Sequence, residues 1–240
     1  MLKQLVLTED QMAENYELLI SKIDEYRKKY PDGSRFDNLY NFYMDNAGSI
    51  ITEPASGKLY FHSAFRGGYV HHILTVYEFG KRIKSLYETV GETFTDEEMF
   101  VTLINHDLFK VGDPFNNIPY YLDQDSDWHK KNQKEYFLHN PDLEWMEMTD
   151  RTLYTLSKIN FPLTQNEYIA IKIHDGLYVD GNKPYLINWS ENKTLRSNLP
   201  YLAHHADMLA TRHEYMEYKN QKIVQIYKDW KLLLSFHNLL

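Results

Sequence analysis

Histidines stand beside another histidine or an aspartate at several places in this chain. Three of these groups are His71-His72, His106-Asp107 and His204-His205-Ala206-Asp207. The chain has eleven histidines and no cysteine, so any metal site must be built from imidazole and carboxylate groups. Such a set of nitrogen and oxygen donors suits Mn, Fe, Co, Ni or Zn, with Mg as a further option, and leaves positions for water. A lone histidine is more often a hydrogen-bonded structural residue than a metal ligand, so the placement of these histidines matters more than their number.

Helices must carry these side chains. A Ser/Thr followed three residues later by Glu/Gln predicts helix starts at Thr8, Thr95 and Thr164, and hence helices over 8–30, 95–109 and 164–175. Apolar periodicity predicts further helices over 35–46, 68–89, 129–138, 149–158, 195–217 and 220–236. The three pairs then fall on three separate helices. A His-Asp dipeptide at a helix end can place both side chains on one cation.

The rest of the pattern is sparse in β signals. Residues 177–188, LYVDGNKPYLIN, place turn residues between two short arms and predict a small hairpin or a structured loop. Residues 110–128 have no steady period and predict a long loop, which in a compact domain is more often functional than idle. The predicted fold class is therefore all-α, a helical bundle with a small β-hairpin near 177–188.

Length and charge limit the classes of protein further. We expect one core, with 1–54 as an N-terminal helical extension, 55–217 as the main domain and 218–240 as a C-terminal helix packed on it. With 26 basic and 34 acidic residues, the net charge of −8 argues against a broad duplex-DNA surface. No apolar run approaches the ~20 residues of a membrane span, and the N-terminus turns acidic early, so we expect a cytoplasmic protein without a membrane partner.

Three segments together resemble a known superfamily. Residues 61–76, FHSAFRGGYVHHILTV, then 106–110, HDLFK, then 203–209, AHHADML, resemble the successive motifs of the HD-domain metal-dependent phosphohydrolases. The first segment is similar to the branch of 3′–5′ exoribonuclease-like HD proteins, whose motif reads roughly H-x-A-Y-x-G-G-L-x-x-H-T. The HD dipeptide alone is a weak signal, but this order of motifs is specific. The resemblance covers about residues 55–215 and implies that His72, His106, Asp107 and Asp207 bind the metal.

The resemblance also implies roles for two cations and for the HD aspartate. Lys110 matches the lysine of HDxxK and is expected to face the substrate phosphate, although a lysine at a helix C-terminus is favoured by the helix dipole anyway. Arg66 stands beside the glycines of the first motif and is expected to contact a phosphate or a ribose, with a surface arginine as the alternative. Asp107 is expected to orient the attacking water or to bridge two metals.

Other histidines are candidates for a second metal, or for a place behind the ligands. His129, His139 and His174 lie between the HD pair and Asp207, where many HD proteins carry two further ligands. His174 in KIHDGLY resembles the His-His-Gly of this branch, but Asp175 replaces the second histidine, so a second metal should bind weakly. His139 precedes Asn-Pro, where a turn role is the alternative, and His62 lies inside the first motif. We expect His71 to lie behind the ligand or on the surface, and expect structural roles for His205, His213 and His237.

These residues predict hydrolysis of a phosphoester or phosphoanhydride of a nucleotide by a metal-activated water. The expected partner is a small nucleotide; the oligomeric state is not predicted. A 3′–5′ exonuclease acting on the 3′ end of single-stranded RNA or DNA is the alternative, though the acidic charge makes a long nucleic-acid track less attractive. Two further alternatives are a diiron oxygenase, which needs two of His129, His139 and His174 as ligands, and an inert nucleotide-binding HD module.

Overall fold

The computed structural model describes residues 2–30, 34–91, 94–187 and 190–228, and this part of the chain is mostly helical. The longer helices are α1 (Glu9–Lys29), α2 (Arg35–Asp45), α4 (Gly68–Glu88), α5 (Asp96–Asn105), α7 (Met148–Lys158), α8 (Gln165–Ile173) and α10 (Leu199–Asn220). The short ones are α3 (Ala47–Ile50), α6 (Asp127–Asn132), α9 (Lys183–Leu186) and the 3-10 turns η1 (Leu108–Val111), η2 (Gly176–Tyr178), η3 (Asp180–Asn182) and η4 (Glu191–Lys193). The predicted all-α class is thus confirmed.

The predicted helix starts are formed by reciprocal caps. Thr8, Thr95 and Thr164 each accept a hydrogen bond from the third residue of the helix, whose side chain accepts one in return from the cap backbone. Each cap satisfies two N–H groups that the first turn leaves without an intrahelical partner. The positions of α5 and α8 matter most, because both helices end at a histidine, His106 and His174.

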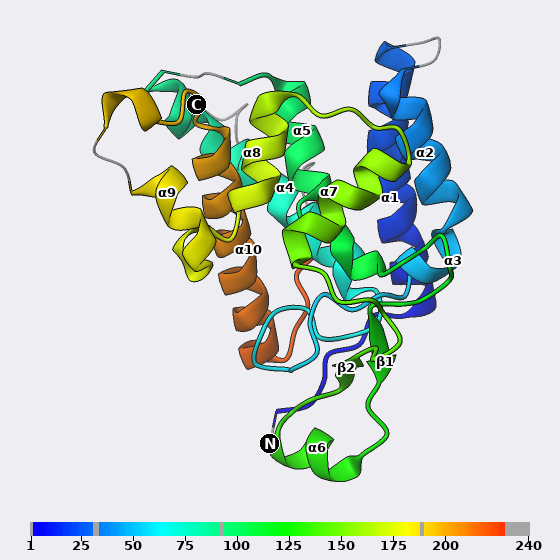
Figure 1. The fold of residues 1–240 in the computed structure, drawn as a ribbon. Helices are drawn as coiled ribbons and strands as arrows, with labels where there is room; N and C mark the ends of the chain where they lie inside the picture. Colours follow the sequence, from blue (N-terminus) through cyan, green and yellow to red (C-terminus); the bar gives the residue numbers. More distant parts are fainter. Residues whose placement is uncertain (1, 31–33, 92–93, 188–189, 229–240) are drawn as a thin grey trace, which may run out of the picture.

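Helix α4 lies at the centre of the bundle and packs against α1, α5 and α10 (Figure 1). Helix α10 runs along α4 and also contacts α8 and α5, with Ala203, Ala206 and Ala210 buried on the shared face. Helices α1 and α2 share one hydrophobic core with α4 and α5, so residues within 1–54 are part of the same core. None of the helices in the described ranges combines the length and apolar character needed to cross a bilayer.

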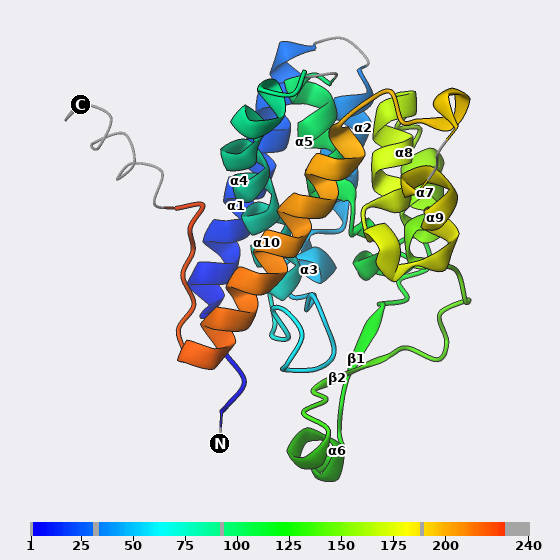
Figure 2. The same ribbon diagram turned by 90° about the vertical axis from the view of Figure 1, so that its left-hand side faces the viewer.

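A small antiparallel pair and helix α6 form an arm at one end of the bundle (Figures 1 and 2). Strand β1 (Tyr121–Asp123) pairs with β2 (Phe137–His139), with Tyr121 opposite His139. The segment 110–128 is therefore not one loop, since it holds η1 and β1. Helix α6 ends at Asn132, before Lys134 adopts a positive φ of 56°, so the helix predicted over 129–138 is wrong beyond that point.

The hairpin predicted at 177–188 is misplaced. Residues 177–187 form η2, η3 and α9, while residue 188 lies outside the described residues. Pro184 stands in the first turn of α9, where its fixed φ suits a helix and its missing N–H costs nothing. The Asn182 side chain donates to the Gly176 carbonyl at 2.9 Å, so the Asp-Gly-Asn sequence closes a compact helical loop and not a two-stranded turn.

The C-terminal part also differs from the prediction. The predicted helix 195–217 is present as α10, which begins with Pro200 in its first turn. It ends where Gln221 adopts a left-handed φ of 53°. Residues 221–228 form no helix, and Tyr227 within this segment is buried. The predicted helix 220–236 is wrong over this stretch, and its remainder, 229–236, lies outside the described residues.

Candidate metal centre

The four residues predicted to bind a metal come together in space. His72 lies near the start of α4, His106 caps the end of α5, Asp107 follows it, and Asp207 lies within α10. Nε2 of His72 is 3.4 Å from Oδ2 of Asp107 and 3.3 Å from Oδ1 of Asp207. Nε2 of His106 is 3.6 Å from Oδ2 of Asp107. These donors therefore surround one common space.

Two further histidines join this cluster. His62 groups with His72 and Asp107, and His174 groups with His106 and Asp107, in each case with ligand atoms within 4.8 Å of one another. The turn that carries His62 packs tightly on α4, because a Cβ on Gly68 would overlap the carbonyl of Ser63. The glycine of the first motif thus lets His62 approach His72, whose ring centroid is 4.5 Å away.

The imidazole nitrogens that face this space lack hydrogen-bond partners. Nε2 of His62, His72 and His106 is buried and makes no hydrogen bond among the described residues. Nδ1 of His106 donates to the Leu103 carbonyl at 2.8 Å, and Nδ1 of His174 donates to the Ile171 carbonyl at 2.8 Å. A neutral histidine that donates from Nδ1 carries its lone pair on Nε2. Buried lone pairs that converge without donors fit a divalent transition metal.

Glu214 supports the cluster from behind, and sequence reasoning missed it. Its buried carboxylate accepts a hydrogen bond from Nδ1 of His72 at 3.0 Å and another from the Ser63 hydroxyl at 2.7 Å. These contacts fix the His72 ring with its Nε2 turned toward the two aspartates. Glu214 follows Asp207 by seven residues, two helical turns on the same face of α10, and that spacing was the available signal.

The remaining histidines do not belong to the cluster. His71 is buried in a separate network, 3.0 Å from Glu217 and 2.7 Å from the Tyr227 hydroxyl. His139 lies on β2 against the rings of Tyr120 and Tyr121 and is not part of any metal-ligating group among the described residues. His129, His204, His205 and His213 bond to Ser126, the His174 carbonyl, Tyr87 and the Val224 carbonyl, respectively, and His237 lies outside the described residues.

The charges of the cluster are strongly coupled. Burial disfavours the charged form of His72, but Glu214, Asp107 and Asp207 outweigh it and raise its pKa well above the usual value. Burial likewise opposes the charged form of His174, yet Asp175 and Asp107 raise its pKa to about 9. Burial also acts to raise the pKa of Asp107, but Lys110 and the neighbouring histidines hold it well below the usual range. A cation in this space would replace those protons as the partner of the carboxylates.

The pKa values of two other histidines in the cluster, His62 and His106, are lowered. Burial, together with His72 and Lys110, lowers the pKa of His62 to about 4. Burial is also the main cause that lowers the pKa of His106. Both rings are therefore neutral near neutral pH, the form in which imidazole binds metals.

The two predicted substrate-binding cations differ in position. Lys110 is buried on η1, with Nζ 3.1 Å from Oδ2 of Asp107. Arg66 is 41% exposed and forms an ion pair with Asp123 at 2.6 Å, above the Phe137 ring. The structure thus brings Lys110 to the cluster, whereas the contacts of Arg66 lie on the arm.

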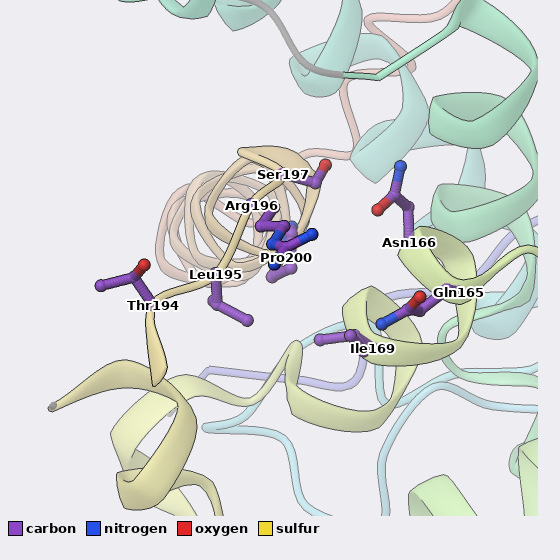
Figure 3. Close-up of a pocket in the computed structure, with 8 residues that line it drawn as sticks. All are labelled: Gln165, Asn166, Ile169, Thr194, Leu195, Arg196, Ser197 and Pro200. Carbon is purple, nitrogen blue, oxygen red and sulfur yellow. The ribbon is translucent and has the colours of Figure 1, made fainter. Parts of the chain in front are cut away.

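A separate hollow lies between the start of α8 and the segment that leads into α10 (Figure 3). Its volume is about 380 Å³, and Gln165, Asn166, Arg196 and Ser197 are among its lining residues. None of the predicted site residues lines it, so it has no part in the metal centre.

Comparison with protein-family models, with curated proteins and with solved structures finds no match to this chain.

Proposed function

We propose that this protein is a metal-dependent phosphohydrolase of the HD-domain type that acts on a nucleotide. The observation that carries the proposal is the convergence of His72, His106, Asp107 and Asp207 around buried imidazole nitrogens that have no hydrogen-bond partner. The motif resemblance and the position of Lys110 beside Asp107 support it. The cytoplasmic location stays a prediction.

Each residue has a distinct part in this proposal. His72, His106, Asp107 and Asp207 would hold the metal, while Glu214 fixes the ring of His72. When bound, a divalent ion would lower the pKa of a water molecule and polarise a phosphoryl oxygen. Asp107 would orient that water, and the Lys110 ammonium, 3.1 Å from Asp107, would balance the charge that develops on the phosphate.

The alternatives receive less support. The diiron oxygenase was expected to draw two ligands from His129, His139 and His174, and only His174 lies in the cluster. The lysine beside Asp107 favours phosphate chemistry, because an ammonium group attracts a phosphate oxygen. The net charge of −8 favours a small nucleotide over a long nucleic-acid chain, although the exonuclease stays a prediction.

Metal analysis of the purified protein, joined to a chromatographic screen of nucleotides with Mn, Mg, Co and Fe, tests the proposal. Asp107→Ala should abolish hydrolysis while the far-UV circular dichroism remains unchanged, because the apolar faces of the bundle are untouched. Asp45→Ala, which removes an exposed aspartate at the end of α2, is the matched control and should retain full activity. Near-normal turnover by Asp107→Ala in a defined metal would show that the proposed site is wrong.

A further inference from the structure

A buried arginine outside the metal cluster has no acidic partner. Arg151 on α7 is only 5% exposed, and it forms no ion pair with any of the described residues. One of its terminal nitrogens donates to the Glu144 carbonyl, while its Nε is buried without a hydrogen bond. A guanidinium cannot lose its charge at ordinary pH, and an uncompensated buried charge is costly. Arg151 therefore requires a counter-charge.

Arg151 lines a cavity of about 400 Å³ between the base of the arm and the first turn of α7. Tyr120, His139, Asn140 and Trp145 line the same cavity. Glu144 and Glu147 are also at its rim, but both are exposed and neither lies within 4.0 Å of the guanidinium as an ion pair. The cavity is thus open to a ligand that brings negative charge.

The first turn of α7 also borders this cavity, and its one acidic side chain, Asp150, is paired with Lys172. Helix α7 has eleven residues, and Glu147 at its N-cap makes no side-chain capping bond. The N–H groups of the first turn therefore lack a side-chain cap, and the helix dipole places partial positive charge there. A helix N-terminus next to an unpaired arginine suits a phosphate or carboxylate group.

The turn η1 packs between residues that line this cavity and the metal centre. The Thr152 hydroxyl, next to Arg151 in sequence, accepts a hydrogen bond from the Phe109 N–H at 3.1 Å and donates to the His106 carbonyl at 3.3 Å. The Phe109 ring packs on Tyr120 of the cavity, with centroids 5.1 Å apart. Lys110, adjacent to Phe109, faces Asp107 on the other side. The cavity therefore lies next to the element that carries Lys110.

We propose that this cavity is an anion subsite, in which Arg151 and the first turn of α7 bind a phosphate group of the substrate other than the one that is hydrolysed. The substrate class would then be a nucleotide with two separated phosphate groups, such as a nucleoside 3′,5′-bisphosphate. The statement about the substrate rests on the proposed phosphohydrolase function, whereas the anion site itself does not.

Binding of inorganic phosphate to the metal-free protein in EDTA tests the anion site without any turnover. We expect saturable binding by calorimetry that Arg151→Met weakens at least about tenfold, the loss typical of a hydrogen bond to a charged group. Arg212→Met removes an exposed arginine on α10 and should bind phosphate like the wild type. Lys110→Met shows which of the two cations binds the phosphate. If Lys110→Met abolishes phosphate binding while Arg151→Met retains it, the proposal is overturned. Absence of phosphate binding by the wild type would overturn it as well.

The substrate class is tested by steady-state kinetics on a matched pair of nucleotides. Arg151→Met should raise KM about tenfold for a nucleoside 3′,5′-bisphosphate and leave KM for the 5′-monophosphate unchanged, because only the former reaches the cavity. Equal effects on both nucleotides would contradict the substrate class.

If Arg151→Met does not fold, Arg151→Lys serves as the second variant, because lysine keeps the charge but lacks the planar guanidinium. Phosphate should then protect Arg151→Lys from thermal unfolding less than it protects the wild type. Equal protection would overturn the anion site. Loss of hydrolysis in every protein, with phosphate binding intact, would refute the phosphohydrolase and not the anion site.

Discussion

His106 and His174 occupy the same position at the ends of two neighbouring helices. Each is the C-cap residue of its helix, and each donates from Nδ1 to the carbonyl three residues earlier, at 2.8 Å in both cases. Their rings meet edge to face, with centroids 4.9 Å apart. Nε2 of His106 lies 3.6 Å from Oδ2 of Asp107, and Nε2 of His174 lies 3.7 Å from Oδ1. Oδ2 of Asp107 therefore lies beside both His72 and His106, whereas Oδ1 lies beside His174.

The number of metals bound depends on His174. We expect about one tightly held ion per chain after dialysis, and a second that binds only at high metal concentration, because Asp175 stands where a further histidine would complete the second site. His174→Ala should abolish the second binding event, and His139→Ala should leave both unchanged, since His139 lies outside the cluster. Elemental analysis and calorimetry measure this. Two tightly retained irons per chain, lost in both variants, would favour the diiron alternative instead.

Metal affinity should also depend on Glu214, which touches no metal. Glu214→Ala removes the acceptor that orients His72, so we expect metal affinity to fall about 10- to 100-fold, as for other groups that support a metal ligand. Glu214→Gln retains an acceptor and should lose less. Glu217→Gln is the matched control, because this buried carboxylate on the same helix bonds to His71 and not to the cluster. Competition with a fluorescent chelator gives the affinities, and equal affinity in Glu214→Ala and the wild type would refute the positioning role.

The sequence predicted the residues that cluster better than the groups that support them. His106-Asp107 and the capping boxes at Thr95 and Thr164 are local signals, and the structure has them where they were predicted. Glu214 was missed because its partners, Ser63 and His72, lie 151 and 142 residues away in the chain. The one local signal was its spacing of seven residues from Asp207, and that spacing does not reveal such distant partners.

The misplaced hairpin has a similar physical cause. The Asp-Gly-Asn turn within 177–188 is a strong local signal, but Pro184 and the Asn182 bond to Gly176 favour a helical loop. The true strands are only three residues each and are separated by α6. Neither strand is long enough to show an alternation of apolar and polar residues, and no tight turn joins them. Pairing of Tyr121 with His139 depends on packing against the bundle, which the sequence pattern does not show.

Lys110 should affect catalysis without holding the metal. Lys110→Ala removes the ammonium 3.1 Å from Asp107, so we expect activity to fall about 100-fold, while metal content near neutral pH stays at the wild-type value. Lys110→Arg keeps the positive charge and should retain more activity than the alanine variant. Turnover and elemental analysis on the same samples provide the comparison. Loss of metal from Lys110→Ala would place the lysine in the metal site itself.

Glu53 should make the stability of the metal-free protein fall as pH rises. Its side chain is 3% exposed, one carboxyl oxygen is buried without a hydrogen bond, and burial, partly opposed by Arg66, raises its pKa from 4.5 to about 8. A carboxyl with a raised pKa keeps its proton in the folded state after the unfolded chain has lost it. Its contribution is therefore fully present below pH 4.5 and is lost as pH rises toward about 8.

Glu53→Gln, which cannot ionise, should remove that part of the pH dependence. For one proton the slope is at most about 1.4 kcal/mol per pH unit, so the variant should gain stability over the wild type as pH rises through this window, and the gain should level off above it. Urea unfolding followed by circular dichroism at several pH values, with EDTA to exclude metal binding, measures the difference. Glu17→Gln, an exposed glutamate on α1, is the control and should follow the wild type. Parallel stability curves for Glu53→Gln and the wild type would show that Glu53 ionises normally in the folded protein.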